Sequence, residues 1–145
     1  MQENQQISHQ STEKPKVAII SCGGMDKALG SVARATAFMI TEKLKPDDTV
    51  LICISPLVAE VKSYSDLVKS CPVITIDGCA ERCATKIAVK AGAKIRGRIF
   101  VPQSAQTHNL KPDTASDIGL EGQKLAEKIA EDTAIIVEKL REKAS

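Results

Sequence analysis

The hydrophobic positions of the chain follow two different periods. Three short runs, at residues 16–21, 49–55 and 73–76, are almost continuously apolar, and a fourth strand is expected at residues 95–101. Such runs are typical of parallel strands that are buried on both faces of a sheet. Between the runs, apolar residues recur every three to four positions, which predicts amphipathic helices. The pattern therefore predicts the order β-α-β-α-β-α-β-α, with the last helix over residues 114–142.

Capping and breaking residues set the expected ends of the first two helices. Asp26 or Ser31 could cap the first helix, and Pro46 follows its end. Pro56 suits the first turn of the second helix, whose apolar period continues to Val68. We therefore expect one helix between the second and third strands.

Glycine and proline residues also divide the second half of the chain. The third helix is expected to open near Cys79, and Gly92 suits the C′ position that ends it. Residues 103–113 are expected to form a loop that contains His108. The last helix could be interrupted near Gly119 or Gly122.

The strict alternation of strands and helices predicts a three-layer, doubly wound α/β fold of the Rossmann/flavodoxin-like type. We expect a four-stranded parallel sheet with right-handed crossovers and the strand order 2-1-3-4. Residues 16–145 are predicted to form a single domain, because the length suits one core. Residues 1–15 are polar and have no periodicity, so we expect a disordered N-terminal tail in which His9 is solvated.

Composition narrows the classes of partner. The chain has no Trp, one Tyr and two Phe, so a stacking platform for single-stranded nucleic acid is not expected. The net charge is +2 with both signs interspersed, which gives no argument for a nucleic-acid partner. No apolar run is long enough for a membrane span, and the N-terminus lacks the apolar region of a signal peptide. We therefore expect a cytoplasmic protein without a membrane or nucleic-acid partner.

Five cysteines carry the candidate chemistry. In a reducing compartment, cysteines are more often metal ligands or reactive thiols than members of a disulfide framework. Cys79 and Cys83 follow the third strand and the pair Asp77-Gly78. On a helix, this i,i+4 spacing would place both sulfurs on one face, and a helix N-terminus would favour a thiolate at Cys79.

Four of the cysteines are expected to converge. In a doubly wound fold, ligands bind beyond the carboxyl ends of the strands, near the switch in strand order. The thiols that belong to this edge follow the first three strands or lie one helical turn further on, and they are Cys22, Cys53, Cys79 and Cys83. Cys71 precedes the third strand, which would carry the chain about 20 Å to the opposite edge. We therefore expect Cys71 to be a buried thiol or a helix-end residue outside the site.

Four convergent thiolates fit a tetrahedral Zn²⁺ site, and they fit an iron–sulfur cluster nearly as well. Two alternatives remain open within this set. Cys53 could be apolar filler in its strand, because free cysteine is among the most buried residue types. His108 follows the fourth strand at the same edge; we favour a surface histidine, although it could replace a cysteine as a ligand.

The cysteine motifs resemble those of the DGC-domain family, which is named for an Asp-Gly-Cys motif. The resemblance rests on the sequence IDGC at residues 76–79, followed by Cys83 and Lys86. It also rests on the sequence CGG at residues 22–24 and on Cys53. It covers about residues 16–101 and is most specific at the central motif. The resemblance implies that four cysteines chelate a metal ion, and it implies no particular reaction.

The main hypothesis is a zinc-binding protein with a role in metal handling, sensing or as an accessory subunit to an unknown protein partner. The alternative is a thiol redox or sulfur-transfer protein in which Cys79 is the nucleophile and Cys83 or Cys22 resolves it. Whether the protein is an enzyme stays open. A phosphate site at residues 22–24 is weakly indicated, since the segment lacks a GxGxxG or Walker motif. Asp77 is expected to cap a turn or helix rather than act as a base.

Overall fold

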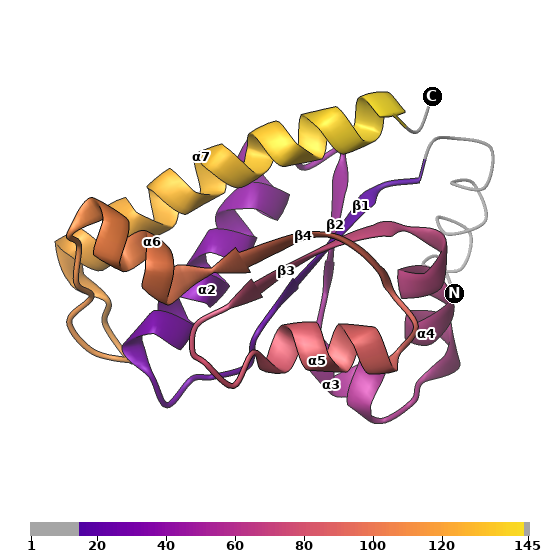
Figure 1. Ribbon diagram of the computed structural model, residues 1–145, viewed down its shortest axis with the longest axis horizontal. Coiled ribbons are helices and arrows are strands. Elements are labelled where there is room, and N and C mark those ends of the chain that lie inside the picture. The colour runs from indigo at the N-terminus through magenta and orange to yellow at the C-terminus, as the bar shows by residue number, and fades with distance from the viewer. Residues whose placement is uncertain (1–14, 144–145) are drawn as a thin grey trace.

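Two central strands, β1 (Val17–Ser21) and β3 (Pro72–Asp77), organise the sheet of the computed structural model, which describes residues 15–143. The strands β2 (Thr49–Ile52) and β4 (Lys94–Phe100) flank them, and all neighbouring strands pair in parallel (Figure 1). The strand order is β2-β1-β3-β4. The predicted α/β class and strand order are therefore confirmed. The predicted tail and His9 lie outside the described residues, apart from Pro15.

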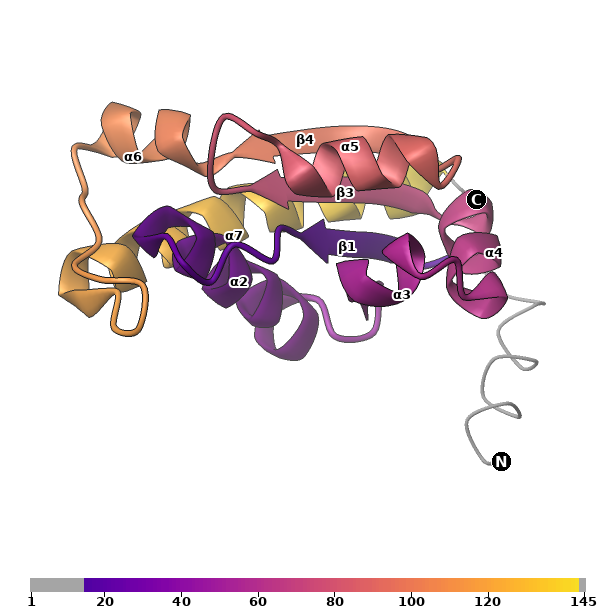
Figure 2. The same ribbon diagram turned by 90° about the horizontal axis from the view of Figure 1, so that it is seen from below.

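The helices form two outer layers on opposite faces of the sheet. One face is covered by α2 (Ala28–Met39), its π-helical extension η2 (Ile40–Leu44) and the long α7 (Gly119–Lys143). The other face is covered by α3 (Ile54–Val58), α4 (Lys62–Ser70) and α5 (Cys83–Lys90) (Figure 2). The remaining helix, α6 (Val101–His108), connects β4 to α7. In the described residues no helix has the length and apolar character needed to cross a membrane.

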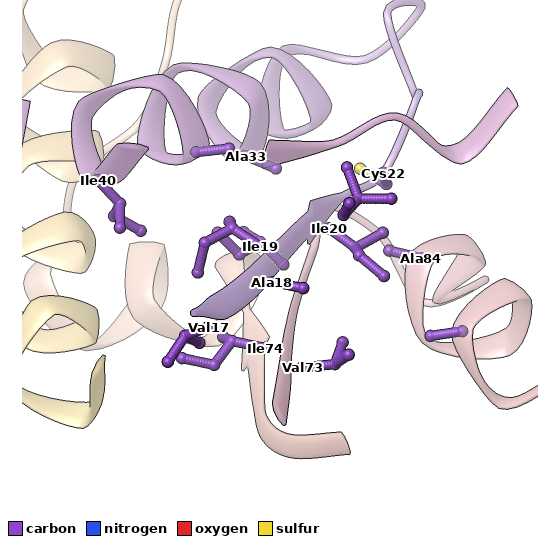
Figure 3. Packing of buried hydrophobic residues seen from close by; sticks show 14 of the residues in the cluster. Val17, Ala18, Ile19, Ile20, Cys22, Ala33, Ile40, Val73, Ile74 and Ala84 are labelled. Atoms are coloured by element: carbon purple, nitrogen blue, oxygen red, sulfur yellow. The ribbon is translucent and has the colours of Figure 1, made fainter. Parts of the chain in front are cut away.

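The core consists of aliphatic side chains on both faces of the central strands. Figure 3 shows Ile19 on the side of Ala33 and Ile40, whereas Ile20 lies on the side of Ala84. All five of these residues have no exposed surface. Burial of an aliphatic side chain contributes about 1.5–3 kcal/mol relative to exposure. A strand that is buried on both faces has few polar positions, which is why the runs of β1 and β3 are almost continuously apolar.

The segment between β2 and β3 differs from the prediction. One helix was expected, but α3 and α4 are separate helices joined by residues 59–61. Glu60 in this connection has a left-handed backbone with φ of 58°, and its N–H donates to the Leu57 carbonyl. A left-handed residue ends a right-handed helix. An apolar period that continued across the break concealed it in the sequence.

The predicted loop at residues 103–113 is also wrong over its first half, because α6 occupies Val101–His108. Pro102 begins this helix rather than only ending β4, as expected of a proline in a first turn. The helix ends at Asn109, which has φ of 52°. The last helix starts at Gly119, later than predicted, and continues through the buried Gly122.

Helix ends were predicted with mixed success. Gly92 follows α5 with φ of 82°, as expected for a C′ residue. Neither Asp26 nor Ser31 caps α2, whose N-cap is Lys27 and which has no side-chain cap. Instead, the Ser31 hydroxyl donates to the Ala115 carbonyl, so this side chain ties α2 to the loop before α7.

Candidate functional site

The loops that follow β1 and β3 touch each other at the carboxyl edge of the sheet. The N–H of Cys22 donates to the Ile76 carbonyl at 2.9 Å and so extends the pairing of the two strands. The N–H of Gly78 then donates to the Cys22 Sγ at 3.3 Å. The first cysteine is therefore held against the Asp-Gly-Cys motif through a backbone hydrogen bond.

Glycine is required at residue 78 because the backbone of α2 lies directly against it. A Cβ atom at Gly78 would lie 2.6 Å from both the N and the Cα of Gly30. Gly30 is itself packed against the Gly24 carbonyl, since a Cβ there would lie 2.0 Å from that oxygen. These three glycines bring two loops and the first turn of α2 into backbone contact, and Gly78 needs this close approach rather than a positive φ.

Asp77 caps α5, as the sequence predicted. Its carboxylate accepts hydrogen bonds from the Ala84 N–H at 2.8 Å, the Thr85 N–H at 3.2 Å and the Thr85 hydroxyl at 2.6 Å. The Thr75 hydroxyl lies 2.8 Å from the Thr85 hydroxyl and donates to it, because the Thr85 proton is directed at the carboxylate. The side chain is only 1 % exposed, so these donors replace the water that the carboxylate loses.

The helix after the motif begins later than predicted. Cys79 precedes α5, and its carbonyl accepts from the Arg82 N–H at 3.1 Å in a tight turn. Arg82 is the N-cap and has φ of 52°, so Cys83 is the first helical residue. The prediction that Cys79 and Cys83 lie on one helical face is therefore wrong. The turn was hidden because CAERCATK contains no glycine or proline to mark a boundary.

Cys22 is the most enclosed of the four candidate ligands. Its side chain is 7 % exposed, and burial raises the pKa of its thiol above the ordinary value. Backbone hydrogen bonds from Gly24 and Gly78 lower the pKa again by favouring the thiolate, whereas the negative charges of Asp77 and Cys79 raise it.

Cys22 and Cys53 line one cleft, which has a volume of about 810 Å³. Cys53 is exposed and forms the N-cap of α3 at the end of β2. The cleft also contains side chains from α2 and α4 that the sequence analysis did not assign to a site, among them Arg34, Phe38 and Tyr64. The guanidinium carbon of Arg34 lies 5.5 Å from the centre of the Phe38 ring. The sequence did contain a signal for this cleft. The chain has only three aromatic residues, and two of them, Phe38 and Tyr64, line it.

The four cysteines do not form a cluster that could bind a metal ion as it stands. Cys79 is partly exposed and Cys83 is exposed. Among residues 15–143, no three His, Cys, Asp or Glu side chains lie together in a way that could hold a metal ion. The structure joins Cys22 to the loop that bears Cys79 through the Gly78 N–H, and Cys22 and Cys53 line the same cleft. The four-cysteine metal site stays a prediction.

Three further positions considered in the sequence lie outside the candidate site. Cys71 is 5 % exposed at the C-cap of α4, immediately before β3 and therefore at the opposite end of that strand from Cys79. Its pKa is raised by burial. His108 is exposed in the last turn of α6, and Lys86 is exposed on α5. These positions agree with a buried structural thiol and two surface side chains.

The fold and this edge together define a class of protein, namely a doubly wound α/β domain with cysteine-bearing loops beyond its parallel strands. The family model described as the DGC domain matches residues 18–129. The chain therefore belongs to the DGC-domain family, as its Asp-Gly-Cys motif indicated. Comparison with curated proteins and with solved structures found no match.

Proposed function

We propose that the protein binds a metal ion, Zn²⁺ in the first instance, through the thiolates of Cys22, Cys53, Cys79 and Cys83. The observation that carries this proposal is the hydrogen bond from the Gly78 N–H to the Cys22 Sγ. This contact joins the loop after β1 to the loop that bears Cys79. Family membership supports the same reading, since the motif in contact with Cys22 is the one that names the family.

The chemistry of the donor set fits zinc. Thiolates are preferred zinc ligands, and metal binding displaces the thiol proton. The two backbone N–H groups directed at Cys22 favour its charged form, which is the form that binds metal. Zinc held by four thiolates would have a closed shell and so serve storage, transfer or sensing rather than activation of water.

A role in metal handling fits better than a purely structural role. A complete aliphatic core packs β1 and β3 on both faces without involving Cys53 or Cys83, which are both exposed. Bringing exposed thiols to Cys22 requires the loops to rearrange. Metal loading would therefore be coupled to a change of conformation at this edge, and a sensor or carrier needs such coupling.

The test is metal analysis of protein purified under anaerobic conditions, together with single cysteine variants. We expect about one zinc per chain, consistent with one four-thiolate site, and its loss in Cys22→Ser and Cys79→Ser. Cys71→Ala is the matched control, because this thiol is buried at the other end of β3, and it should retain the metal. Iron with acid-labile sulfide would indicate the cluster alternative. Protein that stays metal-free after reconstitution with zinc would contradict the proposal.

One observation favours the thiol-chemistry alternative. Cys83 is exposed at the first position of α5, and Cys79 lies across the turn that precedes this helix, so a reagent can reach Cys83 beside a second thiol. If this reading holds, the nucleophile is Cys83 and Cys79 is the partner across the turn. Alkylation followed by mass spectrometry on metal-free protein distinguishes the readings. A single fast-reacting thiol at Cys83 supports thiol chemistry, whereas protection of four thiols by zinc supports the metal site.

A further inference from the structure

Positive charge is concentrated in one part of the chain. Residues 82–98 contain six Lys or Arg residues and no Asp or Glu, whereas the rest of the chain has 14 basic and 18 acidic residues. The six cations, which we call the basic strip, are Arg82, Lys86, Lys90, Lys94, Arg96 and Arg98. The small net charge of the whole chain conceals this local excess.

The basic strip consists of two rows of similar length. Arg82, Lys86 and Lys90 recur every four residues along α5 and cover about 12 Å at the helical rise. The second row alternates along β4, where Lys94, Arg96 and Arg98 cover about 13 Å. The Arg82 guanidinium lies 4.1 Å from the centre of the Phe100 ring, which links one end of α5 to the end of β4.

The C-terminal part of the second row lies on the face of the sheet that carries α5. A Cβ at Gly97 would meet Ile74 and Ile136 of α7, so Gly97 faces the α7 layer. Arg98 follows Gly97 in regular register, opposite Thr75, and therefore points to the other face. The register against β3 shifts between Ile95 and Gly97, so the alternation does not continue to Lys94 at the start of the strand. Figure 2 shows β4 alongside α5.

None of these six charges is neutralised within the part of the chain that the structure describes. All six residues are exposed. The ion pairs among residues 15–143 involve Lys27, Lys45, Lys62 and Arg141, which all lie outside the strip. A row of unpaired cations at alternate strand positions is a surface that an anionic partner could complement.

The strip borders an open strand edge. Among the described residues β4 pairs only with β3, so its outer backbone N–H and C=O groups are available to another strand. Cations on an edge strand oppose pairing with a second copy, because like charges would face each other. That protective role explains the row on β4, but it does not explain the second row on α5. The same cations would favour pairing with a strand of opposite charge.

We propose that the outer edge of β4 binds an extended acidic segment of a partner protein, which adds to the sheet as a fifth strand. Acidic side chains on one face of that segment would lie beside Arg98 and the row on α5, and backbone hydrogen bonds to the regular part of β4 after the register shift would set the register. The row on α5 adds to the positive field that steers the segment to the edge. Phe100 is half-buried beneath Arg82, and the strip has no exposed aromatic side chain for base stacking, so a protein strand fits better than a single-stranded nucleic acid.

The basic strip ends next to the Asp-Gly-Cys loop. Arg82 lies between Cys79 and Cys83, so the end of the strip adjoins the Asp-Gly-Cys loop. A partner bound at β4 would be placed next to two of the candidate metal ligands. The docking proposal stands on charge and strand geometry, and it holds whether or not those thiols bind metal.

The experiment measures binding of fluorescent peptides to the full chain by anisotropy. The first peptide has the length of β4 and alternates Glu with Thr, and the second has the same composition with its Glu residues in one block. The test variant is Lys94→Gln/Arg96→Gln/Arg98→Gln, and the matched control is Lys124→Gln/Lys128→Gln/Lys139→Gln on the exposed side of α7. Circular dichroism verifies that both variants fold. Hydrogen exchange reports whether the amides of β4 become protected.

We expect the alternating peptide to bind the native chain. Its affinity for the β4 variant should be at least about tenfold lower, and its affinity for the α7 variant should stay within about twofold of the native value. Amide exchange along β4 should slow in the complex. Equal binding of both peptides without protection of β4 would overturn the proposal. Preferential binding of a single-stranded oligonucleotide or of phosphatidylserine vesicles would overturn it in favour of those partners. Absence of binding to any of these probes would leave the charges on β4 with a protective role alone.

Discussion

At the scale of single residues, the Asp-Gly-Cys motif serves three separate purposes. Asp77 caps the following helix, Gly78 permits backbone contact with α2, and Cys79 provides a thiol near Cys22. Only the third purpose concerns the proposed metal site. The cap made by Asp77 and the backbone contact made by Gly78 hold the loop against Cys22. A thiol site at this place would therefore depend on all three residues of the motif.

Replacement of Gly78 by alanine tests the backbone contact. The added methyl group would lie 2.6 Å from the backbone of Gly30, so α2 and the loop would have to separate. We expect a loss of about 1–3 kcal/mol in the free energy of unfolding, measured by urea titration. Gly23→Ala is the control, because its methyl group would meet the end of the flexible Ile54 side chain. Similar losses for both variants would contradict the role given to Gly78.

Cys71 predicts a pH dependence of stability. Burial raises the pKa of its thiol in the folded state, so its contribution is complete below the unfolded pKa of about 8.5. As the pH rises further, the unfolded thiol ionises first and the contribution declines until the folded pKa is passed. The stability advantage of the native chain over Cys71→Ala should therefore shrink between pH 8 and pH 10. Urea titrations of the two proteins across this range measure it, and a constant difference would contradict the expectation.

At the scale of secondary structure, α5 depends on a residue that lies outside it. Its N-cap position is occupied by Arg82, which makes no capping hydrogen bond through its side chain. The buried carboxylate of Asp77 supplies this function from the end of β3. The strand, the cysteine loop and the helix are therefore one structural unit.

Substitution of Asp77 tests this unit. Asp77→Ala would leave two backbone N–H groups of α5 without a partner, and we expect a loss of about 2–3 kcal/mol in the free energy of unfolding. Asp77→Asn retains an acceptor oxygen and should lose less. Asp47→Ala at an exposed position is the control, with an expected change within about 0.5 kcal/mol. Equal losses for Asp77→Ala and Asp77→Asn would indicate that the side chain does not act as a cap.

At the scale of the whole molecule, the domain is stabilised by its sheet and helices. The central strands are enclosed by apolar side chains on both faces, and α7 packs along α2 across one of them. This organisation differs from small zinc domains, whose folding requires the metal. The candidate metal site lies at the edge of a core that is complete without it.

Removal of metal should therefore leave the fold intact. After treatment with a strong chelator, the far-ultraviolet circular dichroism spectrum should keep its α/β form, and the cooperative thermal transition should persist at a lower temperature. The reason is that binding stabilises the folded state only by the free energy of binding. A chain that unfolds on chelation would show that the metal is structural, contrary to the role in metal handling.

Sequence reasoning predicted the elements that depend on local periodicity. The four strands and their alternation with helices followed from these patterns, and the strand order is the one expected of a doubly wound fold. The break at Glu60 and the turn at Arg82 were missed. Both residues adopt a left-handed backbone, which a sequence normally indicates by glycine, and neither of them is glycine. The predicted loop at residues 103–113 failed for a related reason, since Pro102 was taken as the end of a strand when it also begins a helix.

By itself, the sequence determined the α/β class, the family and the strand ends to which the cysteines belong, because these depend on periods and motifs within short segments. Only the tertiary structure decided which groups touch. It placed the Gly78 N–H on Cys22, the Asp77 carboxylate on α5, and Cys53 in a cleft with Cys22. It also showed that three of the cations of residues 82–98 lie on an edge strand and that the other three lie on the neighbouring helix. Such contacts join residues far apart in the chain, and their distances depend on how loops and helices pack, which no local pattern encodes.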